Sequence, residues 1–543
     1  MRQPRKLCVV FLGTLVTVTG CYTTDTGCGQ DAQPPCTMAA ALAPPTPMVP
    51  ADTPKLPDAP ASQPDDRPMP INLPTALQLA NVRAVDIAAA AERIRVAAAV
   101  LEGAQVLWLP TVTIGGDYNR HDGRNQDNTK GPVADISRSS MMFGAGSGIG
   151  NAAVLDVNAA IFAPLVARQQ LRAREADSQA ASNDTMVAVS DAYFNVQQAR
   201  GELAGGSDAL RRTEDLVALT KKLAPDLFPD LEIFRAEAEL ARRQQAELLG
   251  RERWKVASAE LHRVLRLEPA AQVEPIDPPH LRVELIDLSK SVDDLIPIAL
   301  TYRPELASQQ AQVQATLTLL KQERLRPLIP SVLLRGSSTA VAGTLGAGVF
   351  AGGANSSINN AGMRLDADLQ VLWQLDNLGF GIAPKVHQRE AENRLAAVDL
   401  FRIQDRVAAE VAQAFAQAQS AARRVVVADK GVRAAQASAD KNLLLLSKTK
   451  SEGGKVVVLV RPLEAVAAVQ ALAQAYVDYY GAVADANRAQ FRLYRALGQP
   501  AQCLLQEEHS QMLCAPSPVG ESKPGPRGLT TAVGKNAGST PPR

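Results

Sequence analysis

Two long stretches of the chain are free of helix breakers for most of their length. They cover about 165–224 and 385–450. At a rise of ~1.5 Å per residue, ~60 helical residues extend roughly 90 Å, which is too long for a compact domain and suits the wall of a coiled-coil tube. Aromatic residues make up only 4% of the chain, and alanine is frequent, so we expect helices packed closely through small side chains.

Each long stretch ends at a breaker, which predicts a tip followed by a return helix. The first tip is the run APDLFPD at 224–230, and the second is Glu452-Gly453-Gly454-Lys455. The predicted return helices cover 231–267 and 463–497, and Pro462 can occupy the first turn of the second one.

This arrangement occurs twice along the chain. Residues 73–87 align with residues 292–306 at an offset of 219 residues. Residues 109–111 align with residues 329–331 at an offset one residue larger. Each copy reads as helix, proline, strand, loop, strand, long helix, tip and return helix. We therefore predict two repeats, 71–290 and 291–500.

The predicted strands alternate between apolar and polar residues. Over 364–375 apolar Leu369 and Val371 fall on one face, and Asp366 and Asp368 on the other. The same period of two appears over 111–119 and 153–161, while the polar loops 120–150 and about 340–363 separate the strands. Such segments suit a transmembrane β-barrel with lipid outside and water inside. An amphipathic sheet in a soluble domain is the alternative.

In the barrel interpretation, the aspartates on the polar faces line the lumen, where they bias conduction without doing chemistry. These residues are Asp117, Asp156, Asp366 and Asp368. Four strands leave two open edges in lipid, so one chain needs partner copies to close the wall.

The N-terminus is typical of an exported lipoprotein. Basic residues, an apolar run and Thr19-Gly20-Cys21 predict a signal peptide over 1–20 and lipid attachment at Cys21. Tyr22 follows the cysteine, which resembles the outer-membrane class of such lipoproteins. An ordinary signal peptide with a coincidental cysteine is the alternative. We expect a Pro-rich tether over 21–70 and a disordered tail over 501–543.

Several other function classes are disfavoured. Basic and acidic residues nearly cancel, 57 against 56, so nucleic acid is not an expected partner. The five histidines lack metal-binding spacing, and Gly346–Ala351 fits a dinucleotide fingerprint without a strand-turn-helix context. Cys28/Cys36 and Cys503/Cys514 form disulfides or remain thiols. We therefore expect neither an enzyme, nor a cofactor, nor a metal site.

Four motifs occur in a characteristic order. They are Leu73-x-x-Ala76-Leu77-x-Leu79-Ala80, Leu109-Pro110, Phe162-Ala163-Pro164-Leu165, and Ala489 with Leu493-Tyr494-Arg495-Ala496-Leu497-Gly498. With the twofold repeat, they resemble the TolC-like outer membrane efflux protein family over nearly all of 71–500.

The resemblance implies an α+β membrane protein that forms a homotrimer. Each chain gives four strands to a twelve-stranded β-barrel, which a long α-helical coiled-coil barrel continues into the periplasm. The implied function is a passive outer-membrane exit duct in a tripartite efflux or type I secretion system. Its implied partners are a periplasmic adaptor (membrane fusion) protein, an inner-membrane pump and outer-membrane lipid. Drugs, metal ions and secreted proteins are all exported through such ducts.

The resemblance also implies two kinds of site. The candidate adaptor-docking tips lie in 221–231 and 450–461, with Pro225, Phe228, Gly453, Gly454 and Lys455. An acidic ring often narrows the family's tunnel, and Glu464 occupies one expected position, but Arg461 stands three residues earlier. Arg461 and Glu464 are thus a candidate periplasmic aperture in which the charges pair, with a solvated helix start as the alternative. The rival for the whole chain is a lipid-anchored structural coiled coil that tethers envelope layers without a pore.

Overall fold

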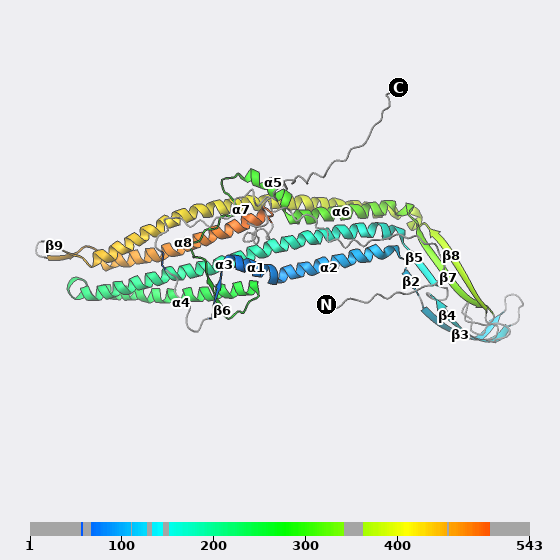
Figure 1. Cartoon of the computed structure of the whole chain (residues 1–543), viewed down its shortest axis with the longest axis horizontal. Coiled ribbons are helices and arrows are strands. Elements are labelled where there is room, and N and C mark those ends of the chain that lie inside the picture. Colours follow the sequence, from blue (N-terminus) through cyan, green and yellow to red (C-terminus); the bar gives the residue numbers. More distant parts are fainter. Residues whose placement is uncertain are drawn as a thin grey trace, which may run out of the picture.

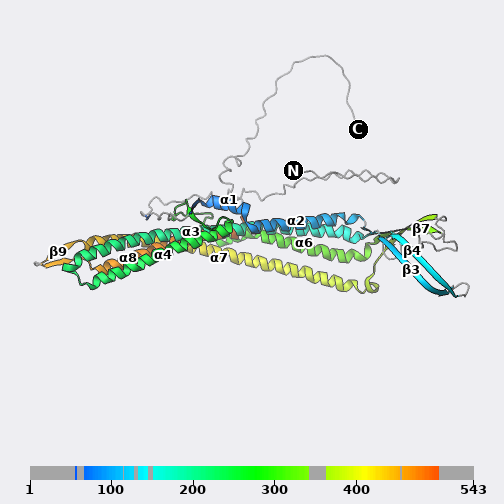
Figure 2. The same cartoon turned by 90° about the horizontal axis from the view of Figure 1, so that it is seen from below.

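The computed structural model describes residues 56–57, 67–109, 111–113, 115–126, 133–144, 151–341, 362–452 and 455–499. These residues form an elongated molecule with strands at one end and helix tips at the other (Figure 1; Figure 2). The predicted signal peptide, Cys21, both cysteine pairs and the C-terminal tail lie outside the described residues.

The two predicted long helices are confirmed. Helix α3 spans Val157–Leu227, and α7 spans Ile382–Leu446. The predicted return helices are confirmed to within two residues as α4, Leu231–Leu265, and α8, Pro462–Ala496. Pro462 occupies the first turn of α8, where its missing N–H breaks no helical hydrogen bond.

The short helices at the start of each half correspond at the predicted offset. Helix α1, Leu73–Arg83, matches α5, Val292–Tyr302, and α2, Val85–Gln105, matches α6, Pro304–Leu325. Two 3-10 turns follow, η2 at Val106–Trp108 and η3 at Arg326–Leu328. The first helices start at equivalent caps: the Asn72 side chain accepts from the Thr75 amide at 3.0 Å, and Ser291 forms a capping box with Asp294.

The helices pack in two rows that share α3 and α7. Toward the strands, α2 packs on α3, α3 on α6, and α6 on α7; toward the tips, α4 packs on α3, α3 on α8, and α8 on α7 (Figure 1). Each row uses both long helices, so the strand end and the tip end are joined by continuous backbone.

The strand end contains a four-stranded antiparallel sheet in the order β2-β5-β7-β8. Its strands are Thr111–Thr113, Asn151–Leu155, Ser331–Val341 and Gly362–Leu372. Within the described strands, β2 pairs only with β5, and β8 only with β7. The outer edges of this sheet are therefore open in a single chain.

Two strand predictions need correction. The segment predicted as a strand over 153–161 is a strand only to Leu155, because Asp156 starts α3: its carboxylate accepts from the Ala159 amide at 3.0 Å. The segment predicted as a loop over 120–150 is largely a hairpin of β3, Gly115–Gln126, and β4, Val133–Gly144. Cross-strand pairing satisfies the backbone of this segment although its sequence shows no strict apolar–polar alternation.

A belt of strands and loops surrounds the middle of the helices. Strand β1, Arg67–Ile71, pairs in parallel with β6, Ala271–Pro275, so the end of the predicted tether is ordered. The buried Trp254 of α4 donates from Nε1 to the Val273 carbonyl at 2.8 Å. The backbone leading to α5 is fixed by α8, whose Asn487 accepts from the Val283 amide at 2.9 Å. The belt therefore ties the N-terminal segment and both halves to one core.

The second tip differs from the prediction. Helix α7 ends at Leu446, before the predicted end near 450, and β9, Thr449–Glu452, pairs with β10, Lys455–Val458. A Gly-Gly pair followed by valines favours a tight hairpin over continued helix. None of the described helices combines the length and apolar character needed to cross a membrane.

Candidate functional site

The candidate aperture residues share the first turn of α8. Arg461 is the residue before the helix, with extended backbone, and its carbonyl accepts from the Glu464 amide at 3.0 Å. Both side chains are exposed, and the Glu464 carboxylate lies where the positive end of the helix dipole favours a negative charge. The two residues are thus close in one chain, while their role as an aperture stays a prediction.

The first tip is tighter than predicted. Pro225 lies inside α3, which continues to Leu227. Phe228 is half-buried and packs against an apolar cluster built from Leu216, Leu446, Ala465 and Val466. The Phe228 ring therefore joins α3, α7 and α8 within the chain, and the exposed apolar side chains nearest this tip are Leu231 and Phe234.

The second tip carries Lys455 at the start of β10, where its backbone is opposite Glu452. Gly453 and Gly454 lie outside the described residues. The hairpin projects beyond the helix ends (Figure 1).

The predicted lumen aspartates fall in three places. Asp117 is in β3 opposite Met142, while Asp366 and Asp368 are in β8 opposite Ser337 and Arg335. Asp156 lies at the junction of β5 and α3, where it caps the helix, so it is not a strand residue. The side chains of the first three lie outside the part that the structure describes.

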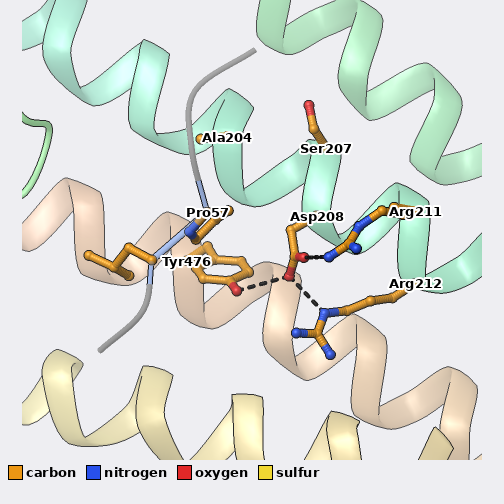
Figure 3. Close-up of a pocket in the computed structure, with 8 residues that line it drawn as sticks. Pro57, Ala204, Ser207, Asp208, Arg211, Arg212 and Tyr476 are labelled. Atoms are coloured by element: carbon orange, nitrogen blue, oxygen red, sulfur yellow. Dashed lines mark hydrogen bonds and ion pairs between the residues drawn. The ribbon is translucent and has the colours of Figure 1, made fainter. Parts of the chain in front are cut away.

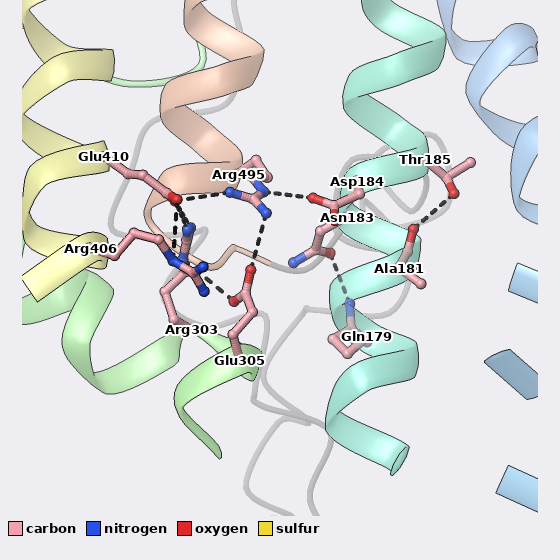
Figure 4. Close-up of polar contacts among 10 residues, drawn as sticks. All are labelled: Gln179, Ala181, Asn183, Asp184, Thr185, Arg303, Glu305, Arg406, Glu410 and Arg495. Carbon is pink, nitrogen blue, oxygen red and sulfur yellow. Dashed lines mark hydrogen bonds and ion pairs between the residues drawn. The ribbon is translucent and has the colours of Figure 1, made fainter. Parts of the chain in front are cut away.

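A charge cluster that sequence patterns did not reveal joins the two halves at mid-length. It contains Asp184 of α3, Arg303 and Glu305 at the start of α6, Glu410 of α7 and Arg495 of α8 (Figure 4). Arg495 donates to all three acids: to Asp184 at 2.7 Å, to Glu410 at 3.1 Å and to Glu305 at 3.2 Å. This cluster fixes the end of α8 against both long helices.

Arg303 is the most buried member of the charge cluster. Its side chain is 2% exposed, and its Nη1 donates to Glu410 Oε2 at 3.0 Å. Removing one partner from a buried ion pair leaves an uncompensated charge and costs about 3–5 kcal/mol. The charge cluster therefore stabilises the packing of α3, α6, α7 and α8 at mid-length, because separating these helices would leave buried charges without partners.

A close helix contact lies between the charge cluster and the tips. We call it the α3–α8 seam: Gly201 and Gly205 of α3 against Tyr480 and Tyr476 of α8. A Cβ at Gly201 would lie 2.5 Å from Tyr480 Cδ1, and one at Gly205 would lie 2.5 Å from Tyr476 Cβ. Only glycine permits this approach, and the spacing of four residues places both on one face of α3. That Gly-x-x-x-Gly spacing is the signal in the sequence from which the seam could have been found.

A buried polar network continues the seam toward α7. Asp208 of α3 accepts from Arg211 at 2.8 Å, from Arg212 at 2.7 Å and from the Tyr476 hydroxyl at 3.0 Å. Gln436 of α7 donates to the same hydroxyl at 3.0 Å, and Arg212 also pairs with Asp440 of α7. The network thus joins three helices.

The network sets the protonation of its members. Burial alone would raise the pKa of Asp208, but the hydrogen bonds from Arg211 and Arg212 outweigh burial and hold that pKa below its ordinary value. Burial raises the pKa of Tyr476 to about 12. At neutral pH, Asp208 is therefore the charged acceptor and Tyr476 a neutral donor.

Among the described residues, no group of His, Cys, Asp and Glu side chains is placed to hold a metal ion. The described helices form a long wall with a sheet at one end and short tips at the other. The charge cluster holds these helices together at mid-length, and the α3–α8 seam holds α3 against α8 nearer the tips.

Comparison with known proteins agrees with this architecture. Residues 76–265 match the profile of a family described as outer membrane efflux protein. No curated protein matches the chain in sequence.

Solved outer-membrane channels share the fold. The outer membrane protein VceC of Vibrio cholerae matches at 15% identity with a TM-score of 0.59, covering 78% of this chain and 96% of that one. The CmeC outer membrane channel of Campylobacter jejuni matches at 14% identity and 0.59, covering 80% and 89%. The open state of the MtrE outer membrane channel of Neisseria gonorrhoeae matches at 14% and 0.59, covering 83% and 98%. The resemblance predicted from the sequence is therefore confirmed: residues 76–265 match the outer membrane efflux protein family, and the fold is that of solved outer-membrane channels.

Proposed function

We propose that the protein is a passive exit duct of the outer membrane that works as a homotrimer in a tripartite efflux or type I secretion system. The two repeats, 71–290 and 291–500, each supply one half of a protomer's wall. The duct provides no energy; it keeps a hydrated path open between a periplasmic adaptor protein, docked to an inner-membrane pump, and the cell exterior.

The observation that carries this proposal is the pair of continuous helices α3 and α7, which connect a sheet with open edges to the tips. The described helices of one chain form two open rows, α2-α3-α6-α7 and α4-α3-α8-α7. The edges of the rows carry exposed apolar side chains: Val96 and Val100 on α2, Leu248 on α4, and Val398, Phe401 and Val427 on α7. Packing α7 of one copy against α2 and α4 of the next would bury these side chains and close a ring.

The sheet supports the same closure. Pairing β8 of one copy with β2 of the next would remove the open edges, and three copies of a four-stranded sheet make a twelve-stranded barrel. Leu369 and Val371 are exposed in the single chain, as side chains that face lipid would be. Asp117, Asp366 and Asp368 then line the water-filled side.

At the other end, the tips are the proposed docking surface for the adaptor. The candidate docking residues Gly453 and Gly454 come between Glu452 and Lys455, which pair in the projecting hairpin, while Leu231 and Phe234 add exposed apolar area next to Pro225 and Phe228. Arg461 and Glu464 lie beside this surface at the start of α8, where paired charges would narrow the entrance. Cys21 carries the lipid that holds each chain at the outer membrane.

Single-channel conductance of the unboiled oligomer in a planar bilayer, measured together with its mass, tests the proposal. A trimeric mass with stable conductance steps is the expected result. A monomer or dimer without conductance would contradict a duct and favour the rival, a lipid-anchored coiled coil that tethers envelope layers without a pore.

A further inference from the structure

Two residues of the N-terminal segment lie against the helical wall, apart from the strand that follows them in sequence. Leu56 and Pro57 line a cavity of about 510 Å³ with residues of α3 and with Tyr476 of α8. Figure 3 shows Pro57 between Ala204 and Tyr476, beside Asp208. The N-terminal segment therefore contacts the wall at a point on the tip side of the β1–β6 belt.

The cavity is part of the α3–α8 seam. Ala204 and Tyr476 are fully buried, and Gly205, which follows Ala204, is the residue that brings α3 against the Tyr476 ring. Asp208 and Arg212 form the polar side of the cavity and hold the Tyr476 hydroxyl in place.

Leu56 adds an apolar contact to a second helix. It packs against the cluster formed by α7 and α8, which includes Val425, Val432, Leu472 and Tyr479. The dipeptide thus touches a surface assembled from α3 of the first half and α7 and α8 of the second. A surface of this kind exists only when the two halves are packed together.

We propose that Leu56 and Pro57 are a clip by which the N-terminal tether docks on the α3–α8 seam and holds α3 and α8 together. Pro57 has a restricted backbone, so less conformational entropy is lost when the clip docks. Leu56 supplies the apolar contact that makes docking favourable.

The part of this proposal that concerns the lipid anchor rests on the proposed function. The stretch of α3 from Val157 to Asp208 is about 75 Å long at 1.5 Å per residue. The roughly 35 residues from Cys21 to Leu56 reach at most about 120 Å, so a chain held by lipid at the strand end can reach the cavity. A Pro-rich linker in the polyproline II conformation rises about 3.1 Å per residue, so about 35 such residues would span roughly 110 Å. The tether can therefore join the lipid to the clip without being stretched.

The sequence around the clip offers a direct test by trypsin. Lys55 immediately precedes the clip, no other basic residue occurs between Lys6 and Arg67, and Arg67 is followed by Pro68, which blocks tryptic cleavage. Cleavage of the native, full-length protein between Cys21 and Arg83 thus reports the Lys55–Leu56 bond alone. We expect this bond to be cut at least roughly tenfold more slowly in the native protein than in urea, because a protease needs the clip to leave the cavity.

Replacing Leu56→Ser removes the apolar contact and should raise the native cleavage rate toward that of the unfolded chain. Val49→Ser is the matched control, because Val49 also precedes a proline in the same tether, and its rate should equal that of the wild type. Amide hydrogen exchange of 204–212 and 472–480 should increase in Leu56→Ser and stay unchanged in Val49→Ser.

Equal native cleavage of wild type and Leu56→Ser would overturn the clip, as would fast cleavage of the native wild type. Unchanged exchange in Leu56→Ser would overturn its hold on the two helices. The residues that Leu56 and Pro57 contact belong to the same chain, so these results can be interpreted whether or not the same sample shows a trimeric mass and conductance.

Discussion

At the scale of single residues, Gly498 is the most constrained position outside the seam. Its φ of +73° is in the left-handed region, and a Cβ there would lie 2.7 Å from the backbone of Tyr302 and Arg303. Backbone atoms cannot move aside as the end of a side chain can. The turn after α8 therefore depends on glycine to seat the Arg303 side of the charge cluster.

Replacing Gly498→Ala should destabilise the protein by more than about 2 kcal/mol, from the left-handed φ and the backbone clash together. Thermal unfolding followed by circular dichroism measures the loss. Gly103→Ala is the control: Gly103 lies in α2 with open space around it, and alanine there should stabilise the helix by roughly 0.5–1 kcal/mol. A similar change in both variants would show that Gly498 is not constrained.

The protonation of Asp208 predicts how the stability of the protein depends on pH. Its pKa is lowered in the folded protein, so its carboxylate stabilises the fold fully above the unfolded pKa of about 3.9, and this contribution is lost as the pH falls through the lower folded value. Asp208→Asn should therefore lower stability by about 1–3 kcal/mol at neutral pH, and the difference from wild type should shrink only below about pH 4.

Chemical unfolding of both proteins between pH 7 and pH 3 measures that difference. Asp440→Asn, which removes the exposed partner of Arg212, should have a smaller effect. A difference that already disappears between pH 7 and pH 5 would contradict the protonation assigned to Asp208.

At the scale of elements, local signals predicted the helices well and the strands less well. The offset of 219 correctly paired α1 with α5 and α2 with α6, because each pair repeats the same apolar spacing. Over 153–161 the alternation of apolar and polar residues wrongly predicted a strand. Asp156 fits a polar position of a strand, but its carboxylate caps α3 by accepting from a free amide of the first turn. The charge cluster could not be predicted, since Arg495 and Asp184 are brought together only by the packing of α8 on α3.

The α3–α8 seam predicts opposite effects of alanine at two neighbouring glycines. Gly205→Ala places a methyl group against Tyr476 Cβ, which cannot swing away, and should cost about 1–3 kcal/mol. The next residue is a matched control, because nothing lies within 4 Å of a Cβ at Gly206. Gly206→Ala should be neutral or stabilising by up to about 1 kcal/mol. Equal unfolding midpoints for the two variants would mean that α3 and α8 are not in close contact.

At the scale of the whole molecule, the open sheet edges and the exposed apolar faces of α2, α4 and α7 support the proposed ring of several copies. The twofold repeat and the long helices made this architecture predictable, because periodicity and length are local properties. The pairing of copies was predicted only through the physics of edges and the family resemblance.

The barrel interpretation predicts unequal effects for two sets of substitutions in β8. Leu369→Arg or Val371→Arg would place a charge on the lipid face, at a cost of about 2–4 kcal/mol near the middle of the bilayer. Asp366 lies on the opposite face, so Asp366→Asn should be tolerated. The amount of heat-resistant trimer in outer-membrane fractions measures assembly, and equal tolerance of all three variants would rule out the assigned faces.

The position of α8 between α3 and α7 constrains when the helical wall can form during biogenesis. Helix α8 is the last of the described helices to be made, yet its Arg492 and Arg495 bind Asp191 and Asp184 of α3, about 300 residues earlier in the chain, and it packs between α3 and α7. Such distant contacts form slowly, and until they form the tip side of α3 lacks one of its two helix partners. The newly made chain must therefore be protected from aggregation and proteolysis until α8 emerges, so that synthesis order, rather than helix propensity, sets the earliest moment at which the wall can exist.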